Sequence, residues 1–247
     1  MMFGDDTSIS CKAKFLIEKT SGRNVAMTMQ RHVVNFTKLS SKTLNKWHAI
    51  PPAIVSDCMN RTHFMTSAIK PLKQGLSLIG QARTVTGMVG DNGISHAAIA
   101  LAEKGEVLVI DAGGYEDVAI WGGIMTHAAM ARGIAGVVID GANRDTAEIQ
   151  SLGFPLFSRS QVPSGPHKDF GGIIDGSISC GGCPVRSGDL VLGDDDGIAV
   201  VPLEWTRKML VACEEKLRQE KEILKQIKEG KTTADIFGIS DLEYIGN

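Results

Sequence analysis

The adjacent opposite charges of Arg144 and Asp145 are the first candidates for chemistry in this sequence. They follow the apolar β-branched run 137–139 and a turn that contains glycine, so we expect a strand to give way to a helix here. Such a pair could serve as a helix cap and a surface ion pair. It could also supply a fixed cation and a hard carboxylate ligand to an active site.

A second candidate is the glycine pair Gly122 and Gly123, which precedes another expected helix. The first N–H groups of that helix, around Ile124 and Met125, have no acceptor within the helix. A helix N-terminus that is opened by small residues can therefore bind a carboxylate or a phosphate. The alternative is that the two glycines only allow tight packing.

Both candidates lie at junctions between a strand and a helix, one strand apart. In a parallel arrangement such junctions meet at one edge of the sheet, so we expect the two candidates to converge. The glycine pair would supply N–H donors for an anion, while Arg144 and Asp145 would supply a cation and a carboxylate. Together they predict a site for a small oxo-acid with a divalent metal ion.

Other patterns favour structural roles. Cys180 and Cys183 have C-x-x-C spacing, but a zinc site needs a second ligand pair and a redox motif would be expected at a helix N-terminus. The run 107–114 leads into glycines without a G-x-G-x-x-G, which argues against a nucleotide cofactor. The acidic run 194–196 is typical of a hairpin turn. The histidines form no metal-binding pair, and His127 inside an expected helix is interpreted as a core or surface residue.

The elements that would position these residues alternate between strands and helices. Predicted strands cover residues 77–90, 106–114 and 135–143, and an extended segment covers residues 154–161. Predicted helices cover residues 94–105, 123–133 and 144–153, and two shorter helices fall within residues 39–61. Residues 164–202 alternate β-branched runs with Gly and Asp turns, which predicts an all-β section. This order favours an α/β fold with helices packed on a partly parallel sheet.

The chain divides into three parts on this interpretation. Residues 1–30 form an N-terminal extension, which is aperiodic and is expected to be partly disordered or to lie on a neighbouring subunit. Residues 31–202 form the α/β core. Residues 203–247 form a C-terminal helix and tail, whose helix has only a partial apolar stripe and a charged second half. We expect that helix to pack on a partner subunit.

Composition excludes several classes of protein. The net charge of −2 provides no excess positive charge to attract nucleic acid or an anionic membrane. No stretch approaches the roughly 20 apolar residues that cross a bilayer, and the N-terminus has no signal-peptide pattern. Five cysteines in a chain of 247 residues do not suggest a disulfide framework. These features predict a reduced, cytoplasmic protein with no nucleic-acid or membrane partner.

Four blocks of sequence resemble the family of metal-dependent 4-hydroxy-4-methyl-2-oxoglutarate / 4-carboxy-4-hydroxy-2-oxoadipate aldolases. The blocks are GDNGISHAAIALAEKGEVLVIDAGG, WGGIMTHAAMARGIAGVVIDGANRD, GFPLFSRS and SCGGCPVRSGDLVLGDDDGIAVVP. That family also contains proteins first described as regulators of ribonuclease E activity. The resemblance covers residues 52–236, and the order and spacing of the blocks make it specific for the family.

The resemblance implies a fold, an assembly and a site. The fold would be an α/β sandwich of the swivelling β/β/α type, which is phosphohistidine-domain-like, with a long C-terminal helix. The assembly would be a homotrimer or a dimer of trimers, with active sites at subunit interfaces. Arg144 would contact the substrate as the catalytic residue, and Asp145 would hold Mg²⁺ or Mn²⁺, largely through waters. Pyruvate would bind at a helix N-terminus made by Gly122, Gly123, Ile124 and Met125.

One departure from the resembling aldolases concerns Gly123. Characterised aldolases can carry an acidic residue at this position, where it helps to order water on the metal, and its absence leaves the backbone anion site intact. The resemblance further implies that an acid on the C-terminal helix, Glu220 or Glu222, reaches the site of a neighbouring subunit.

These observations predict a class II aldolase, a carbon–carbon lyase that cleaves 4-hydroxy-2-oxo acids to pyruvate and a second oxo-acid. Oxaloacetate decarboxylation is expected as a side activity because it passes through the same enolate. Two alternatives stay open: a non-catalytic regulator that binds an RNA-processing enzyme, and a sugar-acid lyase or dehydratase on the same scaffold. The presence of both Arg144 and Asp145 favours the enzyme.

Overall fold

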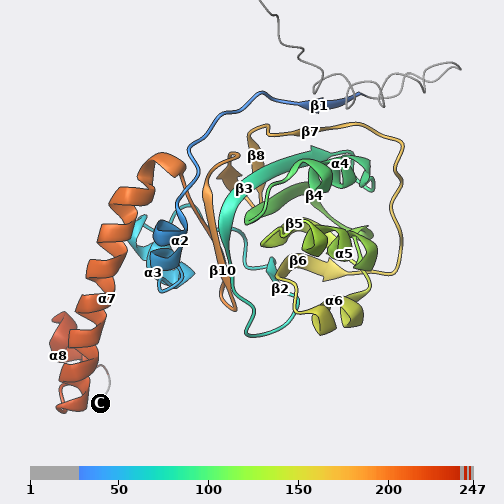
Figure 1. Cartoon of the computed structure of the whole chain (residues 1–247). Helices are drawn as coiled ribbons and strands as arrows, with labels where there is room; N and C mark the ends of the chain where they lie inside the picture. Colours follow the sequence, from blue (N-terminus) through green and yellow to red (C-terminus); the bar gives the residue numbers. More distant parts are fainter. Residues whose placement is uncertain (1–27, 240–241, 244, 246–247) are drawn as a thin grey trace, which may run out of the picture.

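The computed structural model describes residues 28–239, 242, 243 and 245. Its centre is a nine-stranded mixed sheet (Figure 1). Seven of the strands follow the order β1-β7-β3-β4-β5-β6-β2, and the other two are attached because β10 pairs with both β3 and β11. The strands of this sheet are β1 (Met29–Arg31), β2 (Lys70–Pro71), β3 (Leu78–Gly87), β4 (Glu106–Trp121), β5 (Gly136–Asn143), β6 (Leu156–Gln161), β7 (Gly172–Ile174), β10 (Leu190–Asp194) and β11 (Gly197–Val201). The predicted α/β fold class is confirmed.

Strands β3, β4, β5 and β6 run parallel and form the buried middle of the sheet. Their side chains alternate between two faces, as the pleat of a strand requires. In β4, Leu108 and Ile110 join the core under the helices, whereas Val107 and Val109 join the core on the other face. Three helices cover the first face (Figure 1): α4 (Gly93–Leu101), α5 (Gly123–Ala131) and α6 (Thr146–Leu152).

The opposite face is covered in part by a hairpin of β8 (Ile178–Cys180) and β9 (Cys183–Val185), in which Cys180 pairs with Cys183. Both thiols are buried in the core on this face. Burial raises the pKa of both, to about 12 for Cys183, so they stay protonated at neutral pH. Buried, protonated thiols fit the structural role predicted for this motif.

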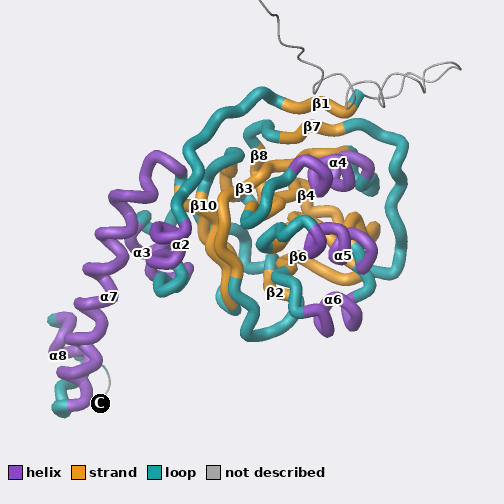
Figure 2. Tube along the Cα trace, viewed as in Figure 1, coloured by secondary structure: helices purple, strands orange, loops and turns teal. Residues whose placement is uncertain are grey.

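A third core lies beside β10 and β11, where three helices gather: α2 (Ser41–Trp47), α3 (Pro52–Cys58) and α7 (Thr206–Lys228). The first turns of α7 bury Met209, Leu210 and Cys213 in this core. The rest of α7 projects away from the sheet, and the short α8 (Thr233–Phe237) lies beside its far end (Figure 2). The long helix expected near residues 203–230 is therefore present, whereas α8 is an element that the sequence pattern did not predict.

Strand β4 is longer than predicted, and its extra length positions the candidate site. The predicted strand stopped at Gly114, but β4 continues to Trp121. Gly113 and Gly114 have φ values of +67° and +69°, which let the strand bulge and then resume pairing with β5. Trp121 consequently lies opposite Asn143, the last residue of β5.

The N-terminal edge of the sheet includes two residues that were predicted to belong to the extension. Met29 and Gln30 form β1 together with Arg31, and this strand pairs in parallel with β7. The prediction for residues 1–27 lies outside the described residues. Within residues 28–239, no helix is both long and apolar enough to cross a lipid bilayer.

Candidate functional site

The ends of β4 and β5 bring the two sequence candidates together at the carboxyl edge of the parallel sheet. Because Trp121 and Asn143 are paired, the residues that follow them lie side by side. The N–H of Arg144 donates to the carbonyl of Trp121 over 3.0 Å, which ties the two junctions to each other. The junctions converge because parallel strands present their carboxyl ends at one edge.

Helix α5 begins directly against the side chain of Asp145. Oδ2 of Asp145 accepts a hydrogen bond of 2.9 Å from the N–H of Gly123. A Cβ on Gly122 would lie 2.6 Å from the same oxygen, so only glycine allows this approach, although the extended backbone of Gly122 suits any residue. The N–H groups of Ile124 and Met125 have no acceptor among the described residues. Two donors therefore stay free at this helix N-terminus.

Asp145 is held in an unusual backbone conformation. It is the N-cap residue of α6, but it has φ 59° and ψ 36° and its side chain makes no capping bond to that helix. A left-handed non-glycine residue costs about 1–3 kcal/mol, and a lost side-chain cap costs about 0.5–2 kcal/mol. The cap that the sequence left as an alternative is thus not formed, because the carboxylate turns toward α5.

The guanidinium of Arg144 lies beside this carboxylate. Its Nε is 3.7 Å from Oδ2 of Asp145, and both side chains are 42% exposed. A Cβ on Gly165, in the segment after β6, would lie 2.6 Å from Nη1 of Arg144, and a Cβ on Gly122 would lie 3.3 Å from its Cγ. Two close glycine backbones therefore confine the arginine while leaving it open to a ligand.

A cavity of about 160 Å³ opens at this point. Its polar lining residues come from the start of α4, from the junction of β5 with α6 and from the segment after β6. They are Asn92, His96, Arg144, Asp145 and Lys168. Gly122, Ile124 and Met125 also line it, whereas Gly123 is not among the lining residues. The cavity is large enough only for a small molecule, and it offers that molecule free N–H donors, cations and a carboxylate.

Asn92 is a cavity residue that the sequence did not single out. It is 4% exposed, and its Nδ2 donates to the carbonyl of Ile120 over 3.0 Å and contacts Sδ of Met125. The bond to Ile120 fixes the orientation of the amide, because the opposite orientation would set two acceptors against each other. Oδ1 then has no partner within the described part of the chain. A buried acceptor left unpaired costs about 1–3 kcal/mol, so a donor from a ligand would relieve it.

His96 and Lys168 form the other wall of the cavity. Asp91 positions them: Oδ1 accepts the N–H of Gly93 at the start of α4, and Oδ2 accepts the N–H of Asp169 beside Lys168. Burial lowers the pKa of His96, and the charge of Lys168 lowers it further. His96 is therefore a neutral imidazole at pH 7, and the cavity carries its positive charge on Arg144 and Lys168. Sequence spacing could not reveal this wall, because His96 and Lys168 are 72 residues apart in the sequence.

The side chains around the cavity suit Mg²⁺ or Mn²⁺ better than zinc. Across residues 28–239 there is no cluster of three His, Cys, Asp or Glu side chains that could hold a metal ion, which argues against a zinc-type site. Asp145 offers a single exposed carboxylate. Mg²⁺ and Mn²⁺ accept oxygen ligands, and Mg²⁺ commonly keeps several waters, so one carboxylate together with a chelating substrate suits them.

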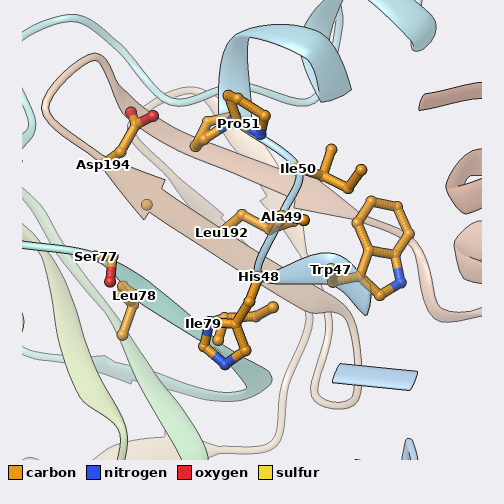
Figure 3. A pocket seen from close by; sticks show the side chains of 12 residues that line it. Trp47, His48, Ala49, Ile50, Pro51, Ser77, Leu78, Ile79, Leu192 and Asp194 are labelled. Atoms are coloured by element: carbon orange, nitrogen blue, oxygen red, sulfur yellow. The ribbon is translucent and has the colours of Figure 1, made fainter. Parts of the chain in front are cut away.

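A larger cavity, of about 210 Å³, lies at the opposite edge of the sheet between the α2–α3 connection and strands β3 and β10. Figure 3 shows its lining, with the side chains of His48 and Asp194 at opposite ends. The apolar side chain of Leu192 lies between them, and Ile79 lies beside His48 (Figure 3). The polar groups do not converge, so this cavity offers no arrangement for catalysis.

Comparison with known proteins identifies the family of the chain. The model of the RraA-like family, described as Aldolase/RraA, matches residues 52–200. A protein of Halalkalibacterium halodurans named "Putative 4-hydroxy-4-methyl-2-oxoglutarate aldolase" is 39% identical over 173 residues, which cover 70% of this chain and 82% of that protein.

Two solved structures share the fold. A protein from Pseudomonas syringae pv. tomato superposes with a TM-score of 0.69 at 26% identity, covering 80% of this chain and 97% of that one. The RNA-processing inhibitor RraA from Thermus thermophilus superposes with a TM-score of 0.57 at 28% identity, covering 62% and 92%. The matched region contains the whole site from Asn92 to Lys168, and this chain belongs to the RraA-like, or Aldolase/RraA, family.

Proposed function

We propose that this protein is a class II aldolase that cleaves 4-hydroxy-2-oxo acids into pyruvate and a second oxo-acid, with Mg²⁺ or Mn²⁺ as its cofactor. One observation carries the proposal: free N–H groups at α5, the guanidinium of Arg144 and the carboxylate of Asp145 meet in one small cavity. The aldolase name of the relative from Halalkalibacterium halodurans supports the same reaction class.

The residues of the chain have distinct tasks in this reaction. The N–H groups of Ile124 and Met125 bind the carboxylate next to the oxo group, with the positive end of the helix dipole behind them. Arg144 orients the substrate and stabilises the charge that develops on its oxygen. Asp145 holds the divalent cation, which when bound supplies Lewis-acid stabilisation of that negative charge.

The bond that breaks is the one between C3 and C4 of the substrate. The hydroxyl on C4 loses its proton and becomes the oxo group of the second product, while C3 gains a proton and becomes the methyl group of pyruvate. Oδ1 of Asn92 is placed to accept a hydrogen bond from a substrate hydroxyl. Lys168 is placed to bind a second carboxylate, so we propose a dicarboxylic or tricarboxylic substrate. Oxaloacetate would lose CO₂ from C4 through the same enolate.

We also propose that the protein works as a homotrimer or a dimer of trimers. Three apolar side chains of α7 are exposed on the single chain, namely Val211, Leu224 and Ile227. Glu220 and Glu222 lie on the same helix and do not line the cavity of Arg144. A catalytic part for either glutamate therefore requires the site of a neighbouring copy.

The alternative functions make different use of the surface. The likeness to the RNA-processing inhibitor RraA favours a regulator that docks on an RNA-processing enzyme, and such a regulator would not need the cavity. A sugar-acid lyase or dehydratase would use the same cation and cavity on another substrate. Inhibition of an RNA-processing enzyme that survives Arg144→Ala would favour the regulator.

A substrate panel tests the proposal. Purified protein is incubated with 2-oxo and 4-hydroxy-2-oxo acids, and with sugar acids, in the presence of Mg²⁺, Mn²⁺ or excess chelator, and pyruvate release is measured. We expect release from 4-hydroxy-2-oxo diacids that stops with chelator and returns with either ion. Borohydride added with pyruvate is expected to leave the protein unlabelled, because the reaction uses no lysine Schiff base. Full activity in excess chelator, or covalent trapping, would exclude the metal mechanism.

A further inference from the structure

Helices α5 and α6 share a histidine–glutamate pair that the proposed reaction does not yet use. His127 lies one turn after Gly123 on the same face of α5, and its Nε2 is 2.9 Å from Oε1 of Glu148 in the first turn of α6. Both side chains are half-exposed. His127 is thus a surface residue, one of the two roles predicted for it.

The carboxylate of Glu148 fills the space beside Gly123. A Cβ on Gly123 would lie 2.8 Å from Cδ of Glu148 and closer still to Oε2. The N–H of the same glycine is bonded to Oδ2 of Asp145. Two carboxylates therefore approach one residue at the N-terminus of α5, and each occupies space that a Cβ on Gly122 or Gly123 would enter.

The spacing of Asp145 and Glu148 matches that of a capping box, yet neither side chain caps α6. Asp145 turns to α5, and Glu148 extends to His127 instead of returning to the N-cap. An exposed polar contact such as that of His127 with Glu148 is worth at most about 1 kcal/mol, which does not make up for a lost cap and a left-handed backbone. Stability of the chain alone does not account for this arrangement.

We propose that Glu148, held by His127, is the second carboxylate of the cation site and supports a divalent ion at Asp145 through the waters of that ion. This inference rests on the proposed function. Two like charges that approach Gly123 repel each other, and a divalent cation beside them removes that cost. Glu148 acts as a positioning residue: its carboxylate orients water on the ion, and His127 orients its carboxylate. The space beside Gly123 is thus occupied by the carboxylate of Glu148, which belongs to α6.

Binding of Mn²⁺ to the full-length protein tests this role separately from catalysis. Free Mn²⁺ is measured by electron paramagnetic resonance during titration of the parent and of the variants, and Asp145→Ala identifies the binding that belongs to this site. We expect Glu148→Ala and Glu148→Gln each to weaken Mn²⁺ binding about 10-fold to 100-fold, as loss of a supporting carboxylate does. Glu103→Ala is the matched control, because Glu103 is exposed and lies at the opposite edge of the sheet. It is expected to bind Mn²⁺ as the parent does.

A compensating substitution gives the sharper readout. Removing Glu148 empties the space beside Gly123, so Gly123→Glu added to Glu148→Ala is expected to recover most of the Mn²⁺ affinity from the other helix. In the parent background Gly123→Glu meets the side chain of Glu148 and is expected to lower the melting temperature. A surface contact of Glu148 with His127 alone would not give this reversal.

The outcomes separate the two proposals. Unchanged Mn²⁺ affinity in Glu148→Ala, or no recovery in the double variant, overturns the role of Glu148 while leaving the aldolase proposal in place. A parent protein that binds Mn²⁺ and shows both effects, but releases pyruvate from no acid, supports the role of Glu148 and overturns the aldolase proposal. A parent that binds no Mn²⁺ overturns both.

Discussion

Asp145 is the N-cap residue of α6, but its Oδ2 accepts the N–H of Gly123 at the start of α5, over 2.9 Å. One side chain therefore joins the first turns of two neighbouring helices at the carboxyl edge of the sheet. The chain gives up a cap and keeps a left-handed aspartate to achieve this. Such local costs are typical of residues whose position serves a ligand more than the fold.

Gly122→Ala tests the close approach of Asp145. The new Cβ would lie 2.6 Å from Oδ2 of Asp145, and the extended backbone at φ −160° accepts alanine without strain, so the carboxylate has to move. We expect turnover to fall by about 10²-fold, as misplaced catalytic groups do, with little change in melting temperature. Gly153→Ala is the control: its φ of +65° disfavours alanine but its surroundings are open, so it should lose stability and keep turnover. Normal kcat in Gly122→Ala would contradict the prediction.

Arg144 and Asp145 are expected to be needed for catalysis and not for folding. Both side chains are 42% exposed, so Arg144→Ala and Asp145→Ala should leave the circular dichroism spectrum and the assembly state unchanged. Turnover should fall by about 10²-fold to 10³-fold in Arg144→Ala, the usual loss for a group that stabilises oxygen charge. Arg144→Lys should recover only part of it, because an ammonium cannot reproduce the planar fork of arginine. If the variants unfold but their folded fraction keeps normal specific activity, these residues are structural.

Arg83 is expected to dominate the stability of the sheet. Its guanidinium contacts both oxygens of Asp175 at 2.9 Å and both oxygens of Glu106 at 2.8 and 3.0 Å, and all three side chains are buried. Arg83→Met leaves two buried carboxylates without this partner, so the free energy of unfolding in urea should fall by about 3–5 kcal/mol. Arg218→Met removes an exposed partner of Glu215, which solvent screens, and should change the free energy of unfolding far less. Equal losses in the two variants would refute this account.

His96 should make stability depend on pH near neutrality. Burial and the charge of Lys168 lower its pKa below the ordinary 6.5, while Asp91 acts the other way. The unfolded chain therefore binds the proton more readily than the folded one, so His96 contributes stability above pH 6.5 that is lost as the pH falls below it. Unfolding in urea at several pH values should show a smaller loss toward acid in His96→Gln than in the parent. The same loss in both proteins would exclude His96 as its source.

The exposed stripe of α7 is expected to couple assembly to activity. Leu224 and Ile227 are exposed on the single chain, whereas Met209, Leu210 and Cys213 hold the first turns of the helix in the core. Leu224→Lys with Ile227→Lys should leave that core intact and dissociate a trimer or hexamer, with loss of turnover. Sedimentation velocity and a pyruvate assay on the same sample check this. A parent protein that is a fully active monomer at micromolar concentration would contradict it.

The sequence by itself determined the alternation of elements and the meeting of the two junctions. The period-2 and helical patterns of residues 77–161 predict these strands and helices within a few residues of their observed ends, except for β4, which continues past the predicted Gly114 to Trp121. Parallel pairing then requires Gly122 and Arg144 to meet, since strands of similar register end at one edge. These are consequences of local pattern and of a simple rule of topology.

Only the tertiary structure decided which side chains complete the site. Asn92, His96 and Lys168 reach the cavity because Asp91 binds the segment after β6 to the start of α4, a contact between residues far apart in the sequence. The capping spacing of Asp145 and Glu148 predicts bonds within α6, whereas the packing of α5 against α6 draws both carboxylates to Gly123 and His127. Local spacing fixes what a side chain can do, and long-range packing selects the partner that it has.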